Sequence, residues 1–268
     1  MNIAKNLRIF GQSGKMGLVA LRKGKGQSVG RTNKLNKERL DNLISMLELE
    51  LTAGYFVQIG AGAGDLDVRA KYNDGFTYIV KSLDSKLVEY IVLVEPNPIN
   101  LKLLEECWSR FSDSKIFHTA IVTNSSVSPH CKFYFSELDG PNYQTCSIDP
   151  EHVLKHYPAE KFKDLRSFTV SGTTLETFLE EFSAQKIALL SLDIEGIDCE
   201  VVLETDFTKF DIQFLSLEYL HMGEKISSVH VHLEKCGFNY VGSGVDWSGH
   251  DILFKNGKVP ASATVSQL

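Results

Sequence analysis

Short apolar runs alternate with helically spaced apolar stripes along most of this chain. Runs of aliphatic and aromatic residues that end in glycine or in an acidic residue are typical of buried strands. They predict strands at residues 55–60, 90–95, 115–122, 187–196 and 214–220. The segments FNYVGS and DILFKN near the C-terminus are typical of a terminal antiparallel pair.

Stripes of apolar residues with the spacing of one helix face lie between these strands. The first stripe, between residues 40 and 47, predicts a helix that begins near Asn36. Later stripes predict helices near residues 76–83, 103–111, 175–182, 197–203 and 226–236. Thr173 and Glu176 have the spacing of a capping box, and Gly237 is placed to end the last helix.

Strands that alternate with helices predict an α/β fold with a Rossmann-like, mostly parallel sheet and helices on both faces. Residues 123–166 interrupt the alternation with turn-rich sequence around a KFYFSE strand. We interpret this segment as an insertion in a single domain that covers residues 36–268. Ligands bind to such sheets at the carboxyl ends of the strands, so the residues that follow each strand are the candidates for a site.

The composition is that of a globular protein, with 43% hydrophobic residues. Its five cysteines are scattered without a CxxC pair, which favours a reducing compartment over disulfides or a zinc site. No apolar run reaches the ~20 residues of a membrane span, and the N-terminus lacks the apolar stretch of a secretory signal. These features predict a cytoplasmic protein.

Charge is distributed unevenly along the chain, whose net charge is −6. Residues 1–40 hold ten Lys or Arg residues and a single acidic residue, Glu38. This Gly- and Lys-rich sequence cannot bury apolar area, so we expect a flexible basic arm at residues 1–35. Two interpretations remain open: a solvated tail, or an arm that attracts phosphate, anionic lipid or nucleic acid.

A glycine-rich turn, GAGAG at residues 60–64, follows the first predicted strand. Glycine lets the backbone turn tightly and approach a ligand closely. The dinucleotide fingerprint places its third glycine three residues after the second, whereas the spacing here is two. Glu95 ends the second predicted strand, where a carboxylate accepts hydrogen bonds from ribose hydroxyls. Together these features predict a nucleoside cofactor, for which S-adenosylmethionine is a better fit than NAD.

Acidic residues gather at the ends of the fourth and fifth predicted strands. Asp193 and Glu195 are two residues apart, so their side chains share one face of a strand, and Glu218 ends the neighbouring strand. Such a cluster requires a bound cation, a cationic sulfonium or proton uptake. One hypothesis is therefore a divalent ion such as Mg²⁺ held by all three carboxylates. The alternative is that they are structural acids at helix N-termini.

The order of these motifs resembles that of the FkbM-type methyltransferases. The resemblance lies in FVQIGAGAGD, YIVLVEPNP, TTLETFL, LLSLDIEGIDCEVVL and FLSLEYLHM, and spans about residues 53–256. It implies the class I methyltransferase fold, S-adenosylmethionine as cofactor, and a lid over residues 123–166 where the acceptor is chosen. The candidate cofactor-binding residues are Gln58, Gly60, Gly62, Gly64, Glu95, Pro96, Asn97 and Asp193.

The chemistry implied by this resemblance is methyl transfer to a hydroxyl, which must be aligned and must lose its proton. Asp193, Glu195 and His221 are the candidate catalytic residues, and His250 is a second candidate base. We expect the acceptor to be a glycan or a natural product. The alternatives are a nucleic-acid methyltransferase that uses the basic arm, and a non-catalytic binding module with the same fold.

Overall fold

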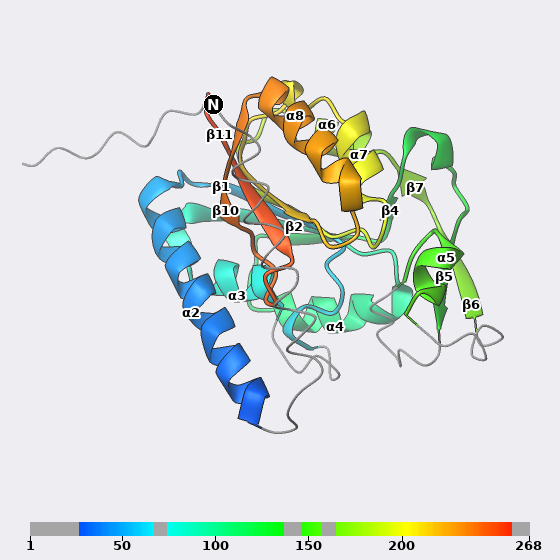
Figure 1. The fold of residues 1–268 in the computed structure, drawn as a ribbon, viewed down its shortest axis with the longest axis horizontal. Coiled ribbons are helices and arrows are strands. Elements are labelled where there is room, and N and C mark those ends of the chain that lie inside the picture. The colour runs from blue at the N-terminus through cyan, green and yellow to red at the C-terminus, as the bar shows by residue number, and fades with distance from the viewer. Residues whose placement is uncertain (1–26, 67–73, 137–145, 157–164, 259–268) are drawn as a thin grey trace, which may run out of the picture. The chain divides into compact units, whose positions relative to one another are not determined.

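The computed structural model describes residues 27–66, 74–136, 146–156 and 165–258 (Figure 1). The chain divides into two compact units, residues 1–38 and residues 39–268. Helix α2 (Gln27–Glu50) begins in the first unit, so the predicted helix starts at Gln27 rather than near Asn36. Residues 1–26 of the expected arm lie outside the described residues.

A seven-stranded sheet forms the centre of the second unit, in the order β10–β11–β9–β8–β1–β2–β3. The strands are β1 (Gly54–Ile59), β2 (Val88–Val94), β3 (Ser114–Phe117), β8 (Ile187–Leu192), β9 (Ile212–Glu218), β10 (Phe238–Ser243) and β11 (Asp251–Asn256). Strand β11 is antiparallel to both of its neighbours, and the pairs from β3 to β9 are parallel. The predicted fold class, including the terminal antiparallel pair, is confirmed.

Helices cover both faces of this sheet (Figure 1). One face carries the second half of α2 with α3 (Gly75–Ser82) and α4 (Pro98–Trp108), whose buried residues join one hydrophobic cluster with the sheet. The other face carries α6 (Leu175–Glu180), α7 (Asp198–Glu204) and α8 (Ile226–Cys236). Single-turn 3-10 helices are η1 (Gly64–Leu66), η2 (Ser85–Leu87), η3 (Asn124–Ser126), η6 (Phe207–Lys209) and η7 (Gly223–Lys225). No helix of the described residues has the length and apolar character needed to cross a bilayer.

The strand predicted at residues 115–122 is divided into two. Strand β3 ends at Phe117, and β4 (Ala120–Ile121) pairs with β7 (Gly172–Thr173) in a separate small sheet. The cause is visible in the hydrogen bonds, because Thr119 Oγ1 and the Ala120 N–H both donate to the Ser171 carbonyl. The chain therefore leaves the central sheet at its edge and turns toward the insertion.

The insertion contains more regular structure than its sequence predicts. Strand β5 (Cys131–Ser136), which the KFYFSE pattern predicts, pairs with an unpredicted antiparallel strand, β6 (Leu165–Val170). A short helix, α5 (Pro150–Leu154), begins after Asp149, whose side chain accepts a hydrogen bond from the Glu151 N–H. Residues 137–145 and 157–164 of the insertion lie outside the described residues.

The start of α6 differs from the predicted capping box by one residue. Thr174, not Thr173, is the N-cap, and its hydroxyl accepts from the Thr177 N–H over 3.0 Å. Glu176 instead accepts hydrogen bonds from the Asp206 N–H and from Lys209. The end of α8 is as predicted, because Gly237 adopts the left-handed conformation with φ 99°.

Candidate active site

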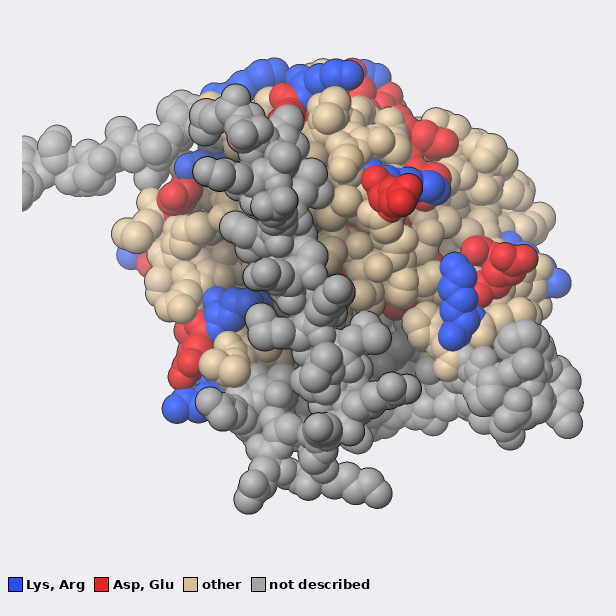
Figure 2. Space-filling view, in the orientation of Figure 1, with Lys and Arg blue, Asp and Glu red and all other residues tan. Residues whose placement is uncertain are grey.

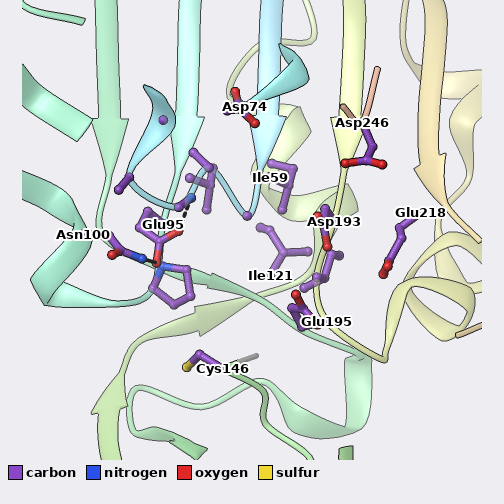
Figure 3. A pocket seen from close by; sticks show the side chains of 18 of the residues that line it. Ile59, Asp74, Glu95, Asn100, Ile121, Cys146, Asp193, Glu195, Glu218 and Asp246 are labelled. Atoms are coloured by element: carbon purple, nitrogen blue, oxygen red, sulfur yellow. Dashed lines mark hydrogen bonds between the residues drawn. The ribbon is translucent and has the colours of Figure 1, made fainter. Parts of the chain in front are cut away.

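A cavity of about 280 Å³ opens at the carboxyl ends of strands β1, β2, β8 and β9 (Figure 3). The glycine turn after β1 forms one wall, and two of its glycines have distinct roles. Gly60 has φ +80°, and a Cβ there would lie 1.8 Å from the Asp193 carbonyl oxygen. Gly62 has φ +55° with no atom within 4 Å of its Cβ position. Gly60 thus permits two strand ends to touch, whereas Gly62 leaves space beside the turn.

Glu95 lies at the end of β2 and connects the glycine turn to α4. Its Oε2 accepts from the Gly62 N–H over 2.7 Å, and its Oε1 accepts from the Asn97 N–H over 2.8 Å and from Asn100 Nδ2 over 3.3 Å. A carboxylate has about four acceptor positions, so one position on Oε2 is left for a ligand. Burial raises the pKa of Glu95 to about 7, although these hydrogen bonds oppose the rise.

The predicted cofactor-binding residues do not all reach the cavity. Gly60, Gly62, Gly64, Glu95, Pro96 and Asp193 line it. Gln58 does not, because its Nε2 donates to Asp74, which caps α3 through the Thr77 N–H. Asn97 does not either, because its side chain caps α4 at the Ile99 N–H. Gln58 and Asn97 therefore stabilise the helix starts that form the walls of the cavity.

The acidic residues after β8 do not lie on a strand, contrary to the expectation of a shared face. Strand β8 ends at Leu192, and Glu195 is left-handed with φ 55°. Asp198 holds this turn, because its carboxylate accepts from the Ile194 and Gly196 N–H groups. The alternation of a strand is lost in such a turn, so the spacing of the two acids does not set their directions.

Asp193, Glu195 and Glu218 nevertheless lie on one side of the cavity, opposite Glu95 and Asn100 (Figure 3). Burial, followed by repulsion from Glu218 and Glu195, raises the pKa of Asp193 well above its ordinary value. Burial and the neighbouring acids also raise the pKa of Glu218 to about 9. Asp193 Oδ1 and Glu218 Oε2 are buried and accept no hydrogen bond from the described residues. Each atom is therefore an unpaired acceptor in a residue that lines the cavity.

The structure does not bring the three predicted magnesium ligands together. Within the described ranges, the group whose ligand atoms lie close enough for a metal consists of His152, His156 and His221. The reason is the direction of Glu195, whose Oε2 lies 3.0 Å from His152 Nε2 instead of facing the other two acids. Nothing in this geometry supports Mg²⁺ at Asp193, Glu195 and Glu218.

The two candidate bases occupy different places. His250 lines the main cavity, and its Nδ1 lies 3.7 Å from Asp246 Oδ2. His221 lines a smaller cavity on the other side of Glu218, with its Nε2 3.8 Å from Glu218 Oε1. Partial burial and the neighbouring imidazoles lower the pKa of His221 to about 4, so this ring is neutral at neutral pH.

The sequence did not predict several residues that line the cavity: Asp74, Asn100, Phe133, Cys146 and Asp246. Asp74 carries a recognisable signal, since an aspartate three residues before the Thr77 N–H is a typical N-cap. Asn100 is the third residue of α4, and its Nδ2 donates a hydrogen bond to Glu95 Oε1. Phe133 and Cys146 come from the insertion, and no local pattern places them at the strand ends.

Comparison with known proteins finds a family match. The family model described as the methyltransferase FkbM domain matches residues 58–240. A solved methyltransferase FkbM from Methylobacillus flagellatus is 11% identical, with a TM-score of 0.42, and the match covers 76% of this chain and 43% of that chain. This chain thus spans less than half of that protein. No curated protein matches it.

Two further solved structures are similar at low identity. A putative RNA methyltransferase from Pyrococcus horikoshii is 11% identical over 89% of this chain and 88% of that chain, with a TM-score of 0.39. Aeropyrum pernix fibrillarin with natively bound S-adenosyl-L-methionine is 8% identical over 76% of this chain and 66% of that chain, with a TM-score of 0.38.

The sheet order and the cavity at the strand ends, together with the family match, define an S-adenosylmethionine-dependent methyltransferase domain of class I fold. The family model covers well over half of the chain. The chain therefore belongs to the FkbM methyltransferase family, as the motifs predict.

The described residues fit this cofactor. Gly62 leaves open space beside a turn whose neighbour Glu95 retains an acceptor position for a hydroxyl. Across the cavity, Asp193 Oδ1 is buried and accepts no hydrogen bond from the described residues. A ligand with hydroxyls at one end and a positive charge at the other suits both walls.

Proposed function

We propose that this chain methylates a hydroxyl group of a neutral acceptor, a glycan or a natural product. One observation carries the proposal: the described lining of the cavity has six carboxylate side chains and contains no lysine or arginine. The carboxylates belong to Asp74, Glu95, Asp193, Glu195, Glu218 and Asp246. Such a wall offers a phosphate group no cation, and its carboxyl groups form hydrogen bonds with hydroxyls.

In this proposal the two walls have separate tasks. Gly62 leaves the backbone of the turn open to the cofactor, Gly60 and Gly64 permit the close packing that shapes the turn, and Glu95 accepts a hydrogen bond from the ribose. When bound, S-adenosylmethionine supplies an electrophilic methyl group on a positively charged sulfonium. Burial and mutual repulsion raise the pKa values of Asp193 and Glu218, and a sulfonium charge beside them favours their ionised forms, whose negative potential then holds the cofactor.

The acceptor proton requires a group that faces the same cavity. His250 meets this requirement, whereas His221 lies on the far side of Glu218. Asp246 lies close to His250 Nδ1 and accepts a hydrogen bond from the His250 N–H over 2.9 Å, so it holds the loop that carries the imidazole. We assign His250 as the proton acceptor and Asp193 as the residue that orients the hydroxyl.

A nucleic-acid acceptor has less support. A phosphate backbone requires a basic surface that leads to the site. On the face that Figure 2 shows, the described acidic and basic side chains lie in small neighbouring groups, without a broad basic patch. The basic sequence at residues 1–26, on which this alternative depends, lies outside the described residues.

The experiment uses S-adenosylmethionine with a labelled methyl group and the full chain. Defined oligosaccharides, hydroxylated natural products, RNA and DNA are offered in separate reactions. We expect label in an oligosaccharide or a natural product, in a form that mild alkali does not release, because an O-methyl ether is stable where a methyl ester is not. Label in RNA or DNA alone would contradict the proposal, as would cofactor binding without transfer to any acceptor.

Variants then test the assigned roles on the acceptor found. We expect Asp193→Asn and His250→Gln to lower turnover at least tenfold, with affinity for S-adenosylhomocysteine, which lacks the sulfonium charge, changed less than threefold. The matched control is Asp113→Asn, an exposed acid away from the cavity. Unchanged turnover in both active-site variants would show that the proton is handled elsewhere.

A further inference from the structure

Three imidazoles converge beside the methyl-transfer cavity. His152 lies in α5, His156 lies in the turn two residues beyond its end, and His221 follows strand β9. One ring nitrogen of each residue lies within 4.8 Å of the others. The rings of His152 and His221 meet edge to face with centroids 4.6 Å apart, and that of His156 completes the group at 5.3 Å and 5.9 Å.

Carboxylates flank this cluster on the side of the cavity. Glu195 Oε2 lies 3.0 Å from His152 Nε2, and Glu218 Oε1 lies 3.8 Å from His221 Nε2. Histidine ligands in metal sites generally have a carboxylate at the second ring nitrogen, which fixes the ring. Glu195 is placed either for this task or to serve as a fourth ligand.

We propose that His152, His156 and His221 bind a divalent first-row transition-metal ion. Imidazole nitrogens suit Zn²⁺ and its neighbours in the row, whereas Mg²⁺ prefers oxygen ligands. Three histidines and a carboxylate or water form a common four-coordinate set with metal–nitrogen bonds of about 2.1 Å. The side chains of His156 and His221 are exposed, so an ion from solvent can reach them.

The ion would connect two separate parts of the fold. His152 and His156 belong to the insertion, and His221 belongs to the connection between β9 and α8. A hydrogen bond from Ser147 Oγ to the Glu195 carbonyl, over 2.7 Å, already joins the insertion to the turn after β8. Binding would therefore fix α5 against the ends of β8 and β9, next to the wall formed by Glu195 and Glu218.

The test uses the full chain without a histidine tag, stripped of metal, and Zn²⁺ or Co²⁺ as the probe. Calorimetry should show one Zn²⁺ bound per chain, with an increase in melting temperature. Co²⁺ should give the visible absorption of a nitrogen-ligated, low-coordinate site. These readouts require no methyl acceptor, so the result is independent of the proposed reaction.

Variants decide whether the cluster is responsible. His156→Ala and His221→Ala should each weaken Zn²⁺ binding at least tenfold and remove the melting shift, and His152→Ala should do the same if it folds. His130→Ala is the matched control, because His130 is exposed and outside the cluster. Equal Zn²⁺ affinity of the parent chain and His156→Ala, or no binding by the parent chain, would overturn the proposal.

Discussion

The Gly62 N–H donates a hydrogen bond of 2.7 Å to Oε2 of Glu95, which joins the turn after β1 to the end of β2. The same carboxylate also holds the start of α4 through the Asn97 N–H. Glu95 therefore supports two walls of the cavity before any ligand is bound. A residue predicted as a ligand of ribose is also a structural member of the site.

The two glycines of the turn should respond differently to alanine. In Gly60→Ala the Cβ meets the Asp193 carbonyl at a positive φ, so we expect a loss of about 3–5 kcal/mol in the free energy of unfolding. In Gly62→Ala only the backbone strain remains, about 1–2 kcal/mol, but its methyl group enters the cavity and should weaken cofactor binding. Urea denaturation and calorimetry measure both effects. Equal stability of the two variants would contradict the assigned roles.

Cofactor affinity should depend on pH through Glu95. Burial raises its pKa to about 7, and the ionised form is the better acceptor for a ribose hydroxyl. Affinity for the demethylated product, S-adenosylhomocysteine, should therefore rise as pH increases toward about 7 and become constant above it, with a slope of at most tenfold per pH unit. Calorimetry between pH 5.5 and about 8.5 measures this.

The control for this pH dependence is Glu95→Gln, which has the same size but no titrating group. It should bind more weakly and with a flat profile over the same range. A pH dependence that persists in Glu95→Gln would assign the titration to another group.

Stability should also depend on pH, through Asp251 on β11. Burial and the neighbouring Asp246 raise its pKa to about 8 despite a hydrogen bond of 2.7 Å from Ser216. The folded state holds this proton more tightly than the unfolded state. The contribution of Asp251 to the free energy of unfolding is therefore complete below about pH 4 and is lost as the pH rises toward about 8. Urea denaturation across this range should show declining stability.

Asp251→Asn preserves the shape and the acceptor for Ser216 Oγ but cannot ionise. The free energy of unfolding should then fall less steeply between pH 5 and pH 8, the slope being smaller by at most about 1.4 kcal/mol per pH unit. The exposed Asp211→Asn should leave the slope unchanged. Parallel curves for the parent chain and Asp251→Asn would locate the pH dependence elsewhere.

Gln213 is a polar side chain with no exposure at the start of β9. Its Oε1 accepts from the Thr52 N–H over 3.1 Å, and its Nε2 donates to the Glu50 carbonyl over 2.6 Å. Gln213→Leu leaves both backbone groups without this partner, so we expect a loss of about 2–4 kcal/mol. The exposed Gln185→Leu should change stability by less than about 0.5 kcal/mol in the same urea titration. A small effect at Gln213 would show that water replaces the amide.

The elements that could be predicted from the sequence are those with strong local signals. Strands β8 and β9 are rich in apolar residues because both of their faces are buried. Helix α8 ends where predicted, because glycine adopts the left-handed conformation without strain and Gly237 occupies that position. The glycine turn and Glu95 meet because the ends of neighbouring parallel strands lie at the same edge.

The parts that could not be predicted depend on tertiary contacts. The period of a strand predicts a common direction for Asp193 and Glu195, but the turn after Leu192 is set by Asp198 from the following helix. The histidine cluster combines a local signal, the helical spacing of His152 and His156, with His221 from a distant segment. The four-residue spacing identifies His152 and His156 as a pair, but only the fold brings His221 beside them.

Strand β11 lies between β9 and β10, although it is the last of the three in the sequence. A ribosome therefore delivers β10 before the strand with which it pairs. Until Asn256 has left the exit tunnel, one edge each of β9 and β10 remains open in the nascent chain. Open strand edges are where neighbouring chains pair wrongly, so the risk of mispairing lasts until β11 is in place.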